Sequence, residues 1–242
     1  MRFNPAGFLM IGLSLALFFG KTPAAVAYEE ITVEKGGELS GTIKLKGEAP
    51  GLRPHKVTHN SEFCGSTVDD ETYLINSANK GLQNVVVSFE EIARGKKHDP
   101  GTIVLENTRC RFVPHILAGM EGDSYEIKNS DPVLHNTHLR FNGATILNVA
   151  MPAGGRNIKK PLTNAGLINA KCDAHTFMTA TILVAKNPYF AITDKDGAYK
   201  IADIPAGRYK VKIWHEDMPV KEKEVTIKPN ENVNLSMELG LK

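Results

Sequence analysis

The sequence predicts an all-β fold, because short apolar or alternating runs recur along almost the whole chain after residue 27. Glycine, proline, asparagine and aspartate separate these runs, as they separate the strands of β-sandwiches and β-barrels. One stretch, FEEIARGKK (89–97), is expected to form a brief helical turn. The predicted architecture is therefore one or two β domains with little helix.

The first 27 residues have the features of a secretory signal peptide. Arg2 precedes an apolar run, FLMIGLSLALFF, and the small residues Ala25 and Ala27 fit cleavage after Ala27. The apolar run is about a dozen residues, shorter than the ~20 that a membrane-spanning helix needs. We therefore expect export to the periplasm or the extracellular space, with no transmembrane segment in the mature chain.

The charge of the mature chain excludes some partners. The full sequence has a formal net charge of +2, and Arg2 and Lys21 would both leave with the signal peptide. The mature chain would then be formally neutral. Such a balance gives no indication of a nucleic-acid or anionic-membrane partner.

The three cysteines are Cys64, Cys110 and Cys172. An odd number leaves at least one of them unpaired. An exposed thiol outside the cytoplasm is prone to oxidation, whereas a metal-bound thiolate is protected. Cys172 is the one with other potential ligands around it. We therefore predict a Cys64–Cys110 disulfide and a functional sulfur at Cys172.

The expected strands alternate or are apolar throughout, and turn residues bound them. In chain order they are 38–47, 82–89, 101–107, 124–129, 135–141, 165–172, 178–185, 197–204, 207–214, 223–228 and 233–239. We divide the chain into a signal peptide (1–27), an N-terminal β segment (28–101), a central domain (102–186) and a C-terminal domain (187–242).

The C-terminal domain begins near Pro188 and contains ITDKDGAYKIADIPAGRYKVKIW. Here DKDG is a hairpin turn in which Gly197 supplies a positive φ, and Pro205 opens the next turn. This stretch resembles the carboxypeptidase regulatory-like (transthyretin-like) domain family, which implies a small β-sandwich without catalysis. That family opens with a strand resembling GGELSGTIKLKG (36–47), so the central domain is either inserted into this sandwich or arranged in series with it.

Two histidines lie in the segment NSDPVLHNTHLRF (129–141). Because strand residues alternate between faces, His135 shares the apolar side with Leu139 and Phe141. His138 falls on the polar side with Arg140. His135 is therefore the candidate metal ligand, and His138 is expected at the surface.

A loop with the sequence KCDAHTFM (171–178) supplies Cys172, His175 and Met178. Together with His135 it offers two imidazoles, one thiolate and a weak thioether, the donor set of copper sites that transfer electrons. Zinc prefers a further cysteine or histidine to methionine, and an iron–sulfur cluster needs more thiolates. The donor set therefore predicts one copper ion.

The order of these motifs is similar to that of the cupredoxins, the blue-copper proteins of the plastocyanin type. The resemblance covers about 85 residues and comprises FVPHILAGMEGDSYEIKNSDPVLHNTH, MPAGG and LTNAGLINAKCDAHTFM. It implies a Greek-key β-sandwich with His135, Cys172, His175 and Met178 as ligands. Asn136 would tie the two ligand-bearing segments together.

One feature departs from the family pattern. Only Thr176 and Phe177 separate His175 from Met178, whereas the family usually has a longer spacing. This puts ligation by Met178 in doubt more than ligation by the cysteine and the histidine. A shifted Met178 would leave the copper more open.

These observations predict an exported one-electron carrier with a protein redox partner, and no enzymatic activity. A copper-binding or delivery protein, or a surface module with a structural metal, is the alternative. The role of His115, which follows Pro114, stays open between ligand, hydrogen-bond donor and disulfide neighbour. The histidines expected to be exposed are His55, His59, His98 and His215.

Overall fold

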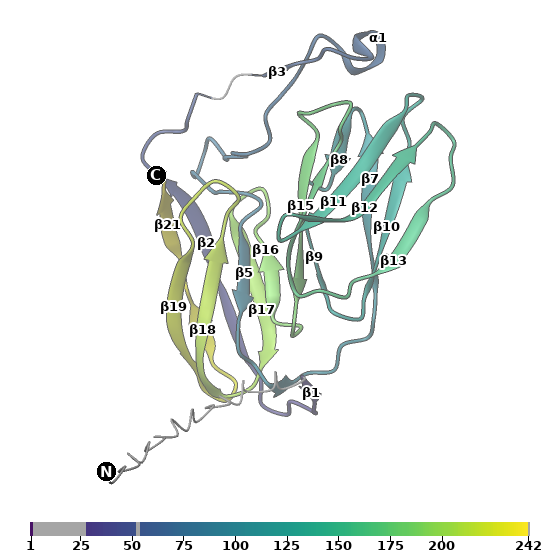
Figure 1. Ribbon diagram of the computed structural model, residues 1–242. Coiled ribbons are helices and arrows are strands. Elements are labelled where there is room, and N and C mark those ends of the chain that lie inside the picture. The colour runs from purple at the N-terminus through teal and green to yellow at the C-terminus, as the bar shows by residue number, and fades with distance from the viewer. Residues whose placement is uncertain (2–27, 52–53, 242) are drawn as a thin grey trace.

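A computed structural model describes Met1 and residues 28–51 and 54–241 of the chain. The predicted signal peptide lies outside the described residues. The regular structure of the described chain is almost entirely β, which confirms the predicted fold class, and it forms two sandwiches that lie side by side (Figure 1). Among the described residues, no helix is long and apolar enough to cross a bilayer.

The first sandwich comprises two sheets formed by residues 102–185. One has the strand order β13-β10-β7-β8 and the other the order β12-β11-β14-β15-β9. The strands are β7 (Thr102–Thr108), β8 (Arg111–Val113), β9 (Ile116–Met120), β10 (Ser124–Asn129), β11 (His135–Phe141), β12 (Ala144–Met151), β13 (Ile158–Pro161), β14 (Gly166–Lys171) and β15 (Thr179–Ala185). Their inward side chains, such as Leu105, Phe112 and Ile182, are fully buried between the sheets.

The second sandwich takes strands from both ends of the described chain. Its sheets have the orders β16-β5-β18-β19 and β17-β2-β20, and β21 extends the pairing along β2. The strands are β2 (Gly37–Lys46), β5 (Val86–Phe89), β16 (Phe190–Ile192), β17 (Ala198–Ile204), β18 (Gly207–Trp214), β19 (Lys221–Ile227), β20 (Asn232–Asn234) and β21 (Met237–Gly240). The first sandwich is thus inserted in sequence between β5 and β16.

The turn before β17 shows why the second sandwich needs a glycine. Gly197 has a φ of +74°, and a Cβ there would lie 2.2 Å from the carbonyl oxygen of Ile43. The carboxylate of Asp194 accepts hydrogen bonds from the N–H groups of Asp196 and Ala198, at 2.8 and 2.9 Å. The DKDG turn therefore lets β17 approach β2 closely.

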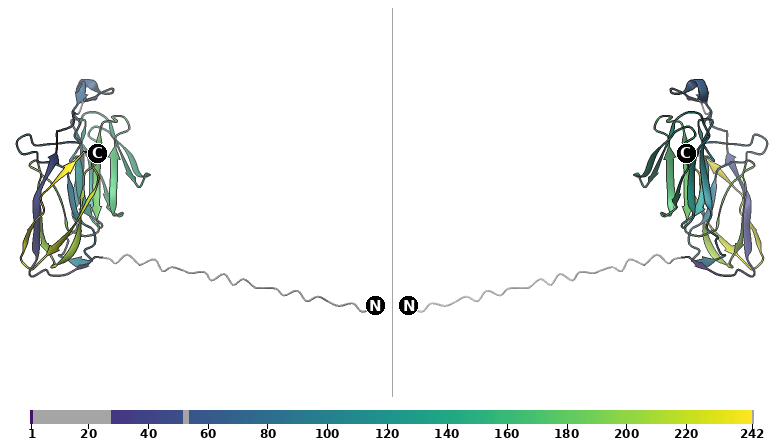
Figure 2. Two further views of the ribbon diagram at one scale, coloured as in Figure 1. Left: turned by 90° about the vertical axis from the view of Figure 1, so that its left-hand side faces the viewer. Right: turned by 90° about the vertical axis from the view of Figure 1, so that its right-hand side faces the viewer.

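The short elements lie outside the sandwiches. They are β1 (Glu29–Glu30), β3 (His55–Lys56), α1 (Ser61–Cys64), β4 (Thr67–Val68) and β6 (Arg94–Gly95). The helix α1 projects from the upper end of the molecule in Figure 1, and both side views show it at the same end (Figure 2).

The helical turn predicted at 89–97 is wrong. That stretch contains the end of β5 and the strand β6, which pairs with β1, and the described helix lies at Ser61–Cys64 instead. Phe89 and Ile92 have helical spacing, but both pack into the core of the second sandwich. Phe89 ends β5, and Ile92 lies in the loop that follows. The strand β12 had no predicted counterpart, although its second half alternates between partly buried and exposed residues; most of its residues are exposed.

Candidate metal centre

Three predicted ligands meet at one end of the first sandwich. His135 is the first residue of β11, Cys172 directly follows β14, and His175 lies in the loop between β14 and β15. One donor atom from each lies within 4.8 Å of the other two. All three side chains are at most 1% exposed. Residues 40 positions apart in the chain therefore form one enclosed group.

The donor atoms already face one another. His135 Nδ1 lies 3.1 Å from His175 Nδ1, and the sulfur of Cys172 lies 3.6 Å from the same His175 nitrogen. The backbone N–H of Asn136 points to the sulfur at 3.5 Å. Two imidazole nitrogens and a sulfur at these separations are near enough to share a single ion.

The loop between β14 and β15 is closed by its own backbone. The N–H of Met178 donates to the carbonyl of His175 at 2.8 Å, and the N–H of Cys172 donates to the carbonyl of Met178 at 3.2 Å. Met178 is 2% exposed and packs in the first core. The tight loop thus keeps Met178 beside the group, and its ligation of the metal stays a prediction.

Asn136 joins the two ligand-bearing segments as the sequence suggested. Its Oδ1 accepts a hydrogen bond from the N–H of Asp173 at 2.5 Å, and its Nδ2 donates to the Asp173 carboxylate at 2.9 Å. Because Asn136 follows His135 and Asp173 follows Cys172, these bonds fix the spacing of the two donors.

Sequence reasoning missed Asp131, which orients His135. The imidazole Nε2 of His135 donates to the buried Asp131 carboxylate at 2.8 Å. That carboxylate also accepts the N–H groups of Arg109 and Cys110 at 2.6 and 2.8 Å. With its proton on Nε2, His135 turns the lone pair of Nδ1 toward Cys172 and His175. The spacing of Asp131 four residues before His135 was the available signal.

The pKa shifts favour the ligand form at Cys172 and His175, whereas a metal would have to displace a proton that the surroundings of His135 favour. Burial alone would lower the pKa of His135, but hydrogen bonds to Cys172 and Asp131 outweigh burial and raise it. Burial would raise the pKa of Cys172, but hydrogen bonds from His135 and the N–H of Asn136 lower it. Burial and the neighbouring His135 lower the pKa of His175. A thiolate and a neutral imidazole are the ligand forms that a metal needs.

The predicted disulfide is confirmed. Cys64 and Cys110 are joined, with their Cα atoms 5.6 Å apart, and Cys172 is free and buried. The Cys64 sulfur lies 4.0 Å from Nε2 of His175. The disulfide therefore contacts the outer edge of the candidate centre.

The remaining histidines lie outside this group. His138 bonds Asp173 at 3.1 Å and is partly exposed. His115 is buried, with Nδ1 3.0 Å from the carbonyl oxygen of Thr179 and Nε2 2.6 Å from the Glu216 carboxylate, so it joins the two sandwiches.

Two of the four histidines predicted to be exposed are not. His215 is 2% exposed because it stacks on Tyr73, which packs against the core of the second sandwich. His98 is partly buried against Asp123 at 2.7 Å. His55 and His59 are exposed as predicted.

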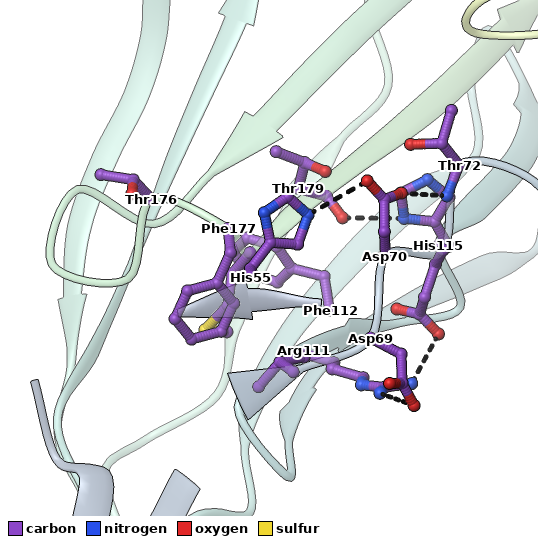
Figure 3. Close-up of a pocket in the computed structure, with 13 residues that line it drawn as sticks. His55, Asp69, Asp70, Thr72, Arg111, Phe112, His115, Thr176, Phe177 and Thr179 are labelled. Carbon is purple, nitrogen blue, oxygen red and sulfur yellow. Dashed lines mark hydrogen bonds and ion pairs between the residues drawn. The ribbon is translucent and has the colours of Figure 1, made fainter. Parts of the chain in front are cut away.

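A small hollow lies beside the ligand loop (Figure 3). It has a volume of about 130 Å³, and its lining includes Phe177, Met178, His115 and His55. The His55 ring stacks on Phe177 with centroids 6.3 Å apart. The three donor residues, His135, Cys172 and His175, do not line this hollow, so the hollow does not open onto the candidate centre.

Comparison with known proteins yields partial structural matches. No family model matches the chain, and no curated protein does. A reduced amicyanin mutant is 22% identical with a TM-score of 0.32, and the match covers 34% of this chain and 81% of that one.

A purple cupredoxin from Nitrosopumilus maritimus is 21% identical with a TM-score of 0.30, covering 36% of this chain and all of that one. A copper-containing nitrite reductase from Thermus scotoductus SA-01 is 17% identical with a TM-score of 0.32, covering 40% of this chain and 25% of that one. The interpretation of the site rests on its own geometry. The carboxypeptidase regulatory-like resemblance stays an expectation.

The donor set tests which metal fits the site. His135, Cys172 and His175 supply two nitrogens and one thiolate, and Met178, whose carbonyl accepts the N–H of Cys172, would supply the thioether. A trigonal N₂S set with a weak sulfur donor suits copper in both oxidation states. Zinc structural sites use four cysteines or histidines, which the described part of the chain does not bring together here. The residues present therefore fit copper.

Proposed function

We propose that this protein is an exported type 1-like copper protein that carries one electron at a time. His135, Cys172 and His175 hold the ion, and Met178 is the weak fourth donor. The observation that carries the proposal is the enclosed convergence of two imidazoles and the unpaired cysteine within 4.8 Å. Bound copper supplies a one-electron couple between Cu(II) and Cu(I).

The chain supports this role by holding the donors rigidly. The Asn136–Asp173 pair fixes the distance between β11 and the ligand loop. Asp131 keeps the proton of His135 on Nε2. Burial of all donors excludes water. A site that barely rearranges between oxidation states favours electron transfer.

The proposed function includes no enzymatic activity. Four donors from the chain leave no coordination position for a substrate. Its partner is accordingly another redox protein, which exchanges an electron without chemical change in this chain.

The test uses the exported protein loaded with copper. The proposal predicts strong visible absorption from thiolate-to-copper charge transfer, which ascorbate bleaches reversibly. Cys172→Ser should abolish the colour, whereas the control Leu105→Ala, which alters the core of the same sandwich outside the donor group, should retain it. A Cys172→Ser protein with full colour would contradict the assignment.

Copper delivery is the second candidate function, because the burial of His175 counts against electron exchange through that imidazole. At 1% exposure this imidazole offers no ligand edge to a docking partner. A colourless protein that transfers Cu(I) rapidly to a chelator, and exchanges no electrons with a soluble redox protein, would support delivery over electron transfer.

A further inference from the structure

A loosely anchored segment covers the outer edge of His175. We define the cap as residues 54–72, which contain β3, α1 and β4. Within this described segment only Val57 and Val68 are buried hydrophobic residues, and α1 has no buried residue. Phe63 of α1 is 40% exposed. Apolar packing therefore holds the cap weakly.

The disulfide attaches the cap covalently to the first sandwich. Cys64 belongs to α1, and Cys110 lies in the turn between β7 and β8. Ion pairs of Arg111 with Glu71 at 3.1 Å and with Asp69 at 3.6 Å, and the stack of His55 on Phe177, add exposed contacts. Since such partly exposed pairs contribute little, the disulfide is the principal attachment.

The same disulfide contacts both imidazoles of the candidate centre. The Cys64 sulfur is 4.0 Å from Nε2 of His175. On the other side, the N–H of Cys110 donates at 2.8 Å to Asp131, which accepts from Nε2 of His135 at 2.8 Å. Opening this bond would disturb the support of both ligands.

A reagent can approach the disulfide from one side. Cys64 lines a hollow of about 580 Å³, together with Thr67, Val68, Asp69, Glu71, Thr108, Arg109, Arg111 and Val113. Cys64 is partly exposed, whereas Cys110 is fully buried. Attack by a thiolate is therefore directed to the sulfur of Cys64.

We propose that the Cys64–Cys110 disulfide is a thiol-addressable latch that holds the cap over His175 and controls access to the metal centre. The regulatory meaning rests on the proposed copper function. The reagent class is a dithiol reductant, reaching the disulfide through the hollow beside Cys64.

The exchange is balanced in two steps. A thiolate of the dithiol attacks the Cys64 sulfur, the Cys64–Cys110 bond breaks, and Cys110 leaves as a thiolate that takes up a proton. The second thiol of the reductant loses its proton and attacks its own sulfur in the mixed disulfide. Cys64 leaves as a thiol, and the dithiol becomes a disulfide. The protein gains two electrons and two protons, and the cap is released.

The first test uses metal-free protein, so it does not depend on the copper function. Cys172 is the free thiol of the oxidised protein and the sole thiol of Cys64→Ser/Cys110→Ser. We expect its reaction with an aromatic disulfide reagent to be at least tenfold faster in the double variant. Rates within twofold of each other would overturn the proposal.

A matched control separates local opening from lost stability. Leu105→Ala removes a fully buried side chain from the same sandwich and leaves the cap attached. When each protein is measured at a urea concentration equally far below its own unfolding midpoint, Cys172 of Leu105→Ala should react at close to the wild-type rate. Equal acceleration in Leu105→Ala and the double variant would show general loosening and would contradict the latch.

The second test locates the attack in the wild-type protein. Brief treatment with glutathione, acid quenching and peptide mass analysis should place the adduct on Cys64. An adduct on Cys110, or no adduct under native conditions, would overturn the proposal. If the latch tests succeed while the protein binds no copper, the proposed function fails and the gating of Cys172 stands.

Discussion

Asp131→Asn tests how the chain supports its first imidazole. The Asp131 carboxylate is 4% exposed and accepts three hydrogen bonds, from two backbone N–H groups and His135. Asparagine keeps one acceptor oxygen and turns its NH₂ group toward a buried N–H, leaving that donor unpaired. An unpaired buried donor costs about 1–3 kcal/mol, so we expect a loss of about 2 kcal/mol in the free energy of unfolding.

The same substitution should change the copper couple. Removing the negative charge behind His135 disfavours Cu(II) relative to Cu(I). We expect at least a tenfold shift in that equilibrium, which corresponds to an increase of about 59 mV in the one-electron reduction potential. Redox titration of the visible band measures it.

Asp123→Asn is the matched control, because Asp123 has the same kind of environment at the opposite end of β10. Its carboxylate accepts the N–H groups of Gly101 and Met120 and contacts Nε2 of His98, at 2.7, 2.8 and 2.7 Å. The two variants should lose similar stability in urea unfolding, but only Asp131→Asn should raise the potential. Equal potentials in both variants would refute the role assigned to Asp131.

Three further predictions concern other parts of the molecule. Burial lowers the pKa of His115, but the hydrogen bond to Glu216 outweighs burial and raises the pKa above its ordinary value of 6.5. The His115–Glu216 pair should therefore stabilise the folded state fully below about pH 6.5. This stabilisation should be lost as the pH rises through the raised pKa. Urea unfolding at pH 6 and pH 9 should show a smaller difference for His115→Gln than for the wild type, and an unchanged difference would contradict this. Met178→Leu should change stability by less than about 1.5 kcal/mol but raise the reduction potential, because a weak donor is lost; an unaltered potential would exclude ligation. Gly197→Ala should cost about 3 kcal/mol by thermal unfolding, since its Cβ would strike the backbone at Ile43, and a neutral result would contradict the turn geometry.

Much of the fold could be predicted because strand alternation and turn residues are local signals. His135 was separated from His138 by parity along one strand, and the structure buries the first and leaves the second partly exposed. Cys64–Cys110 followed from an odd number of cysteines and the ligands around Cys172. These inferences needed no knowledge of tertiary contacts.

The features that sequence reasoning missed are long-range. Asp131 also bonds backbone N–H groups some twenty residues earlier, contacts that its four-residue spacing from His135 does not reveal. His215 directly follows β18 and is buried against Tyr73, which comes from a distant part of the chain, so nothing in its own stretch reveals the burial. The cap also has little regular structure, so its place over His175 is set by the disulfide and not by periodicity.

Anomalous diffraction at the copper absorption edge, from crystals of the copper-loaded protein, tests the central claim most directly. We predict a single strong peak within bonding distance of Nδ1 of His135, Nδ1 of His175 and the sulfur of Cys172. A peak elsewhere, or these three atoms turned away from a shared position, would contradict it.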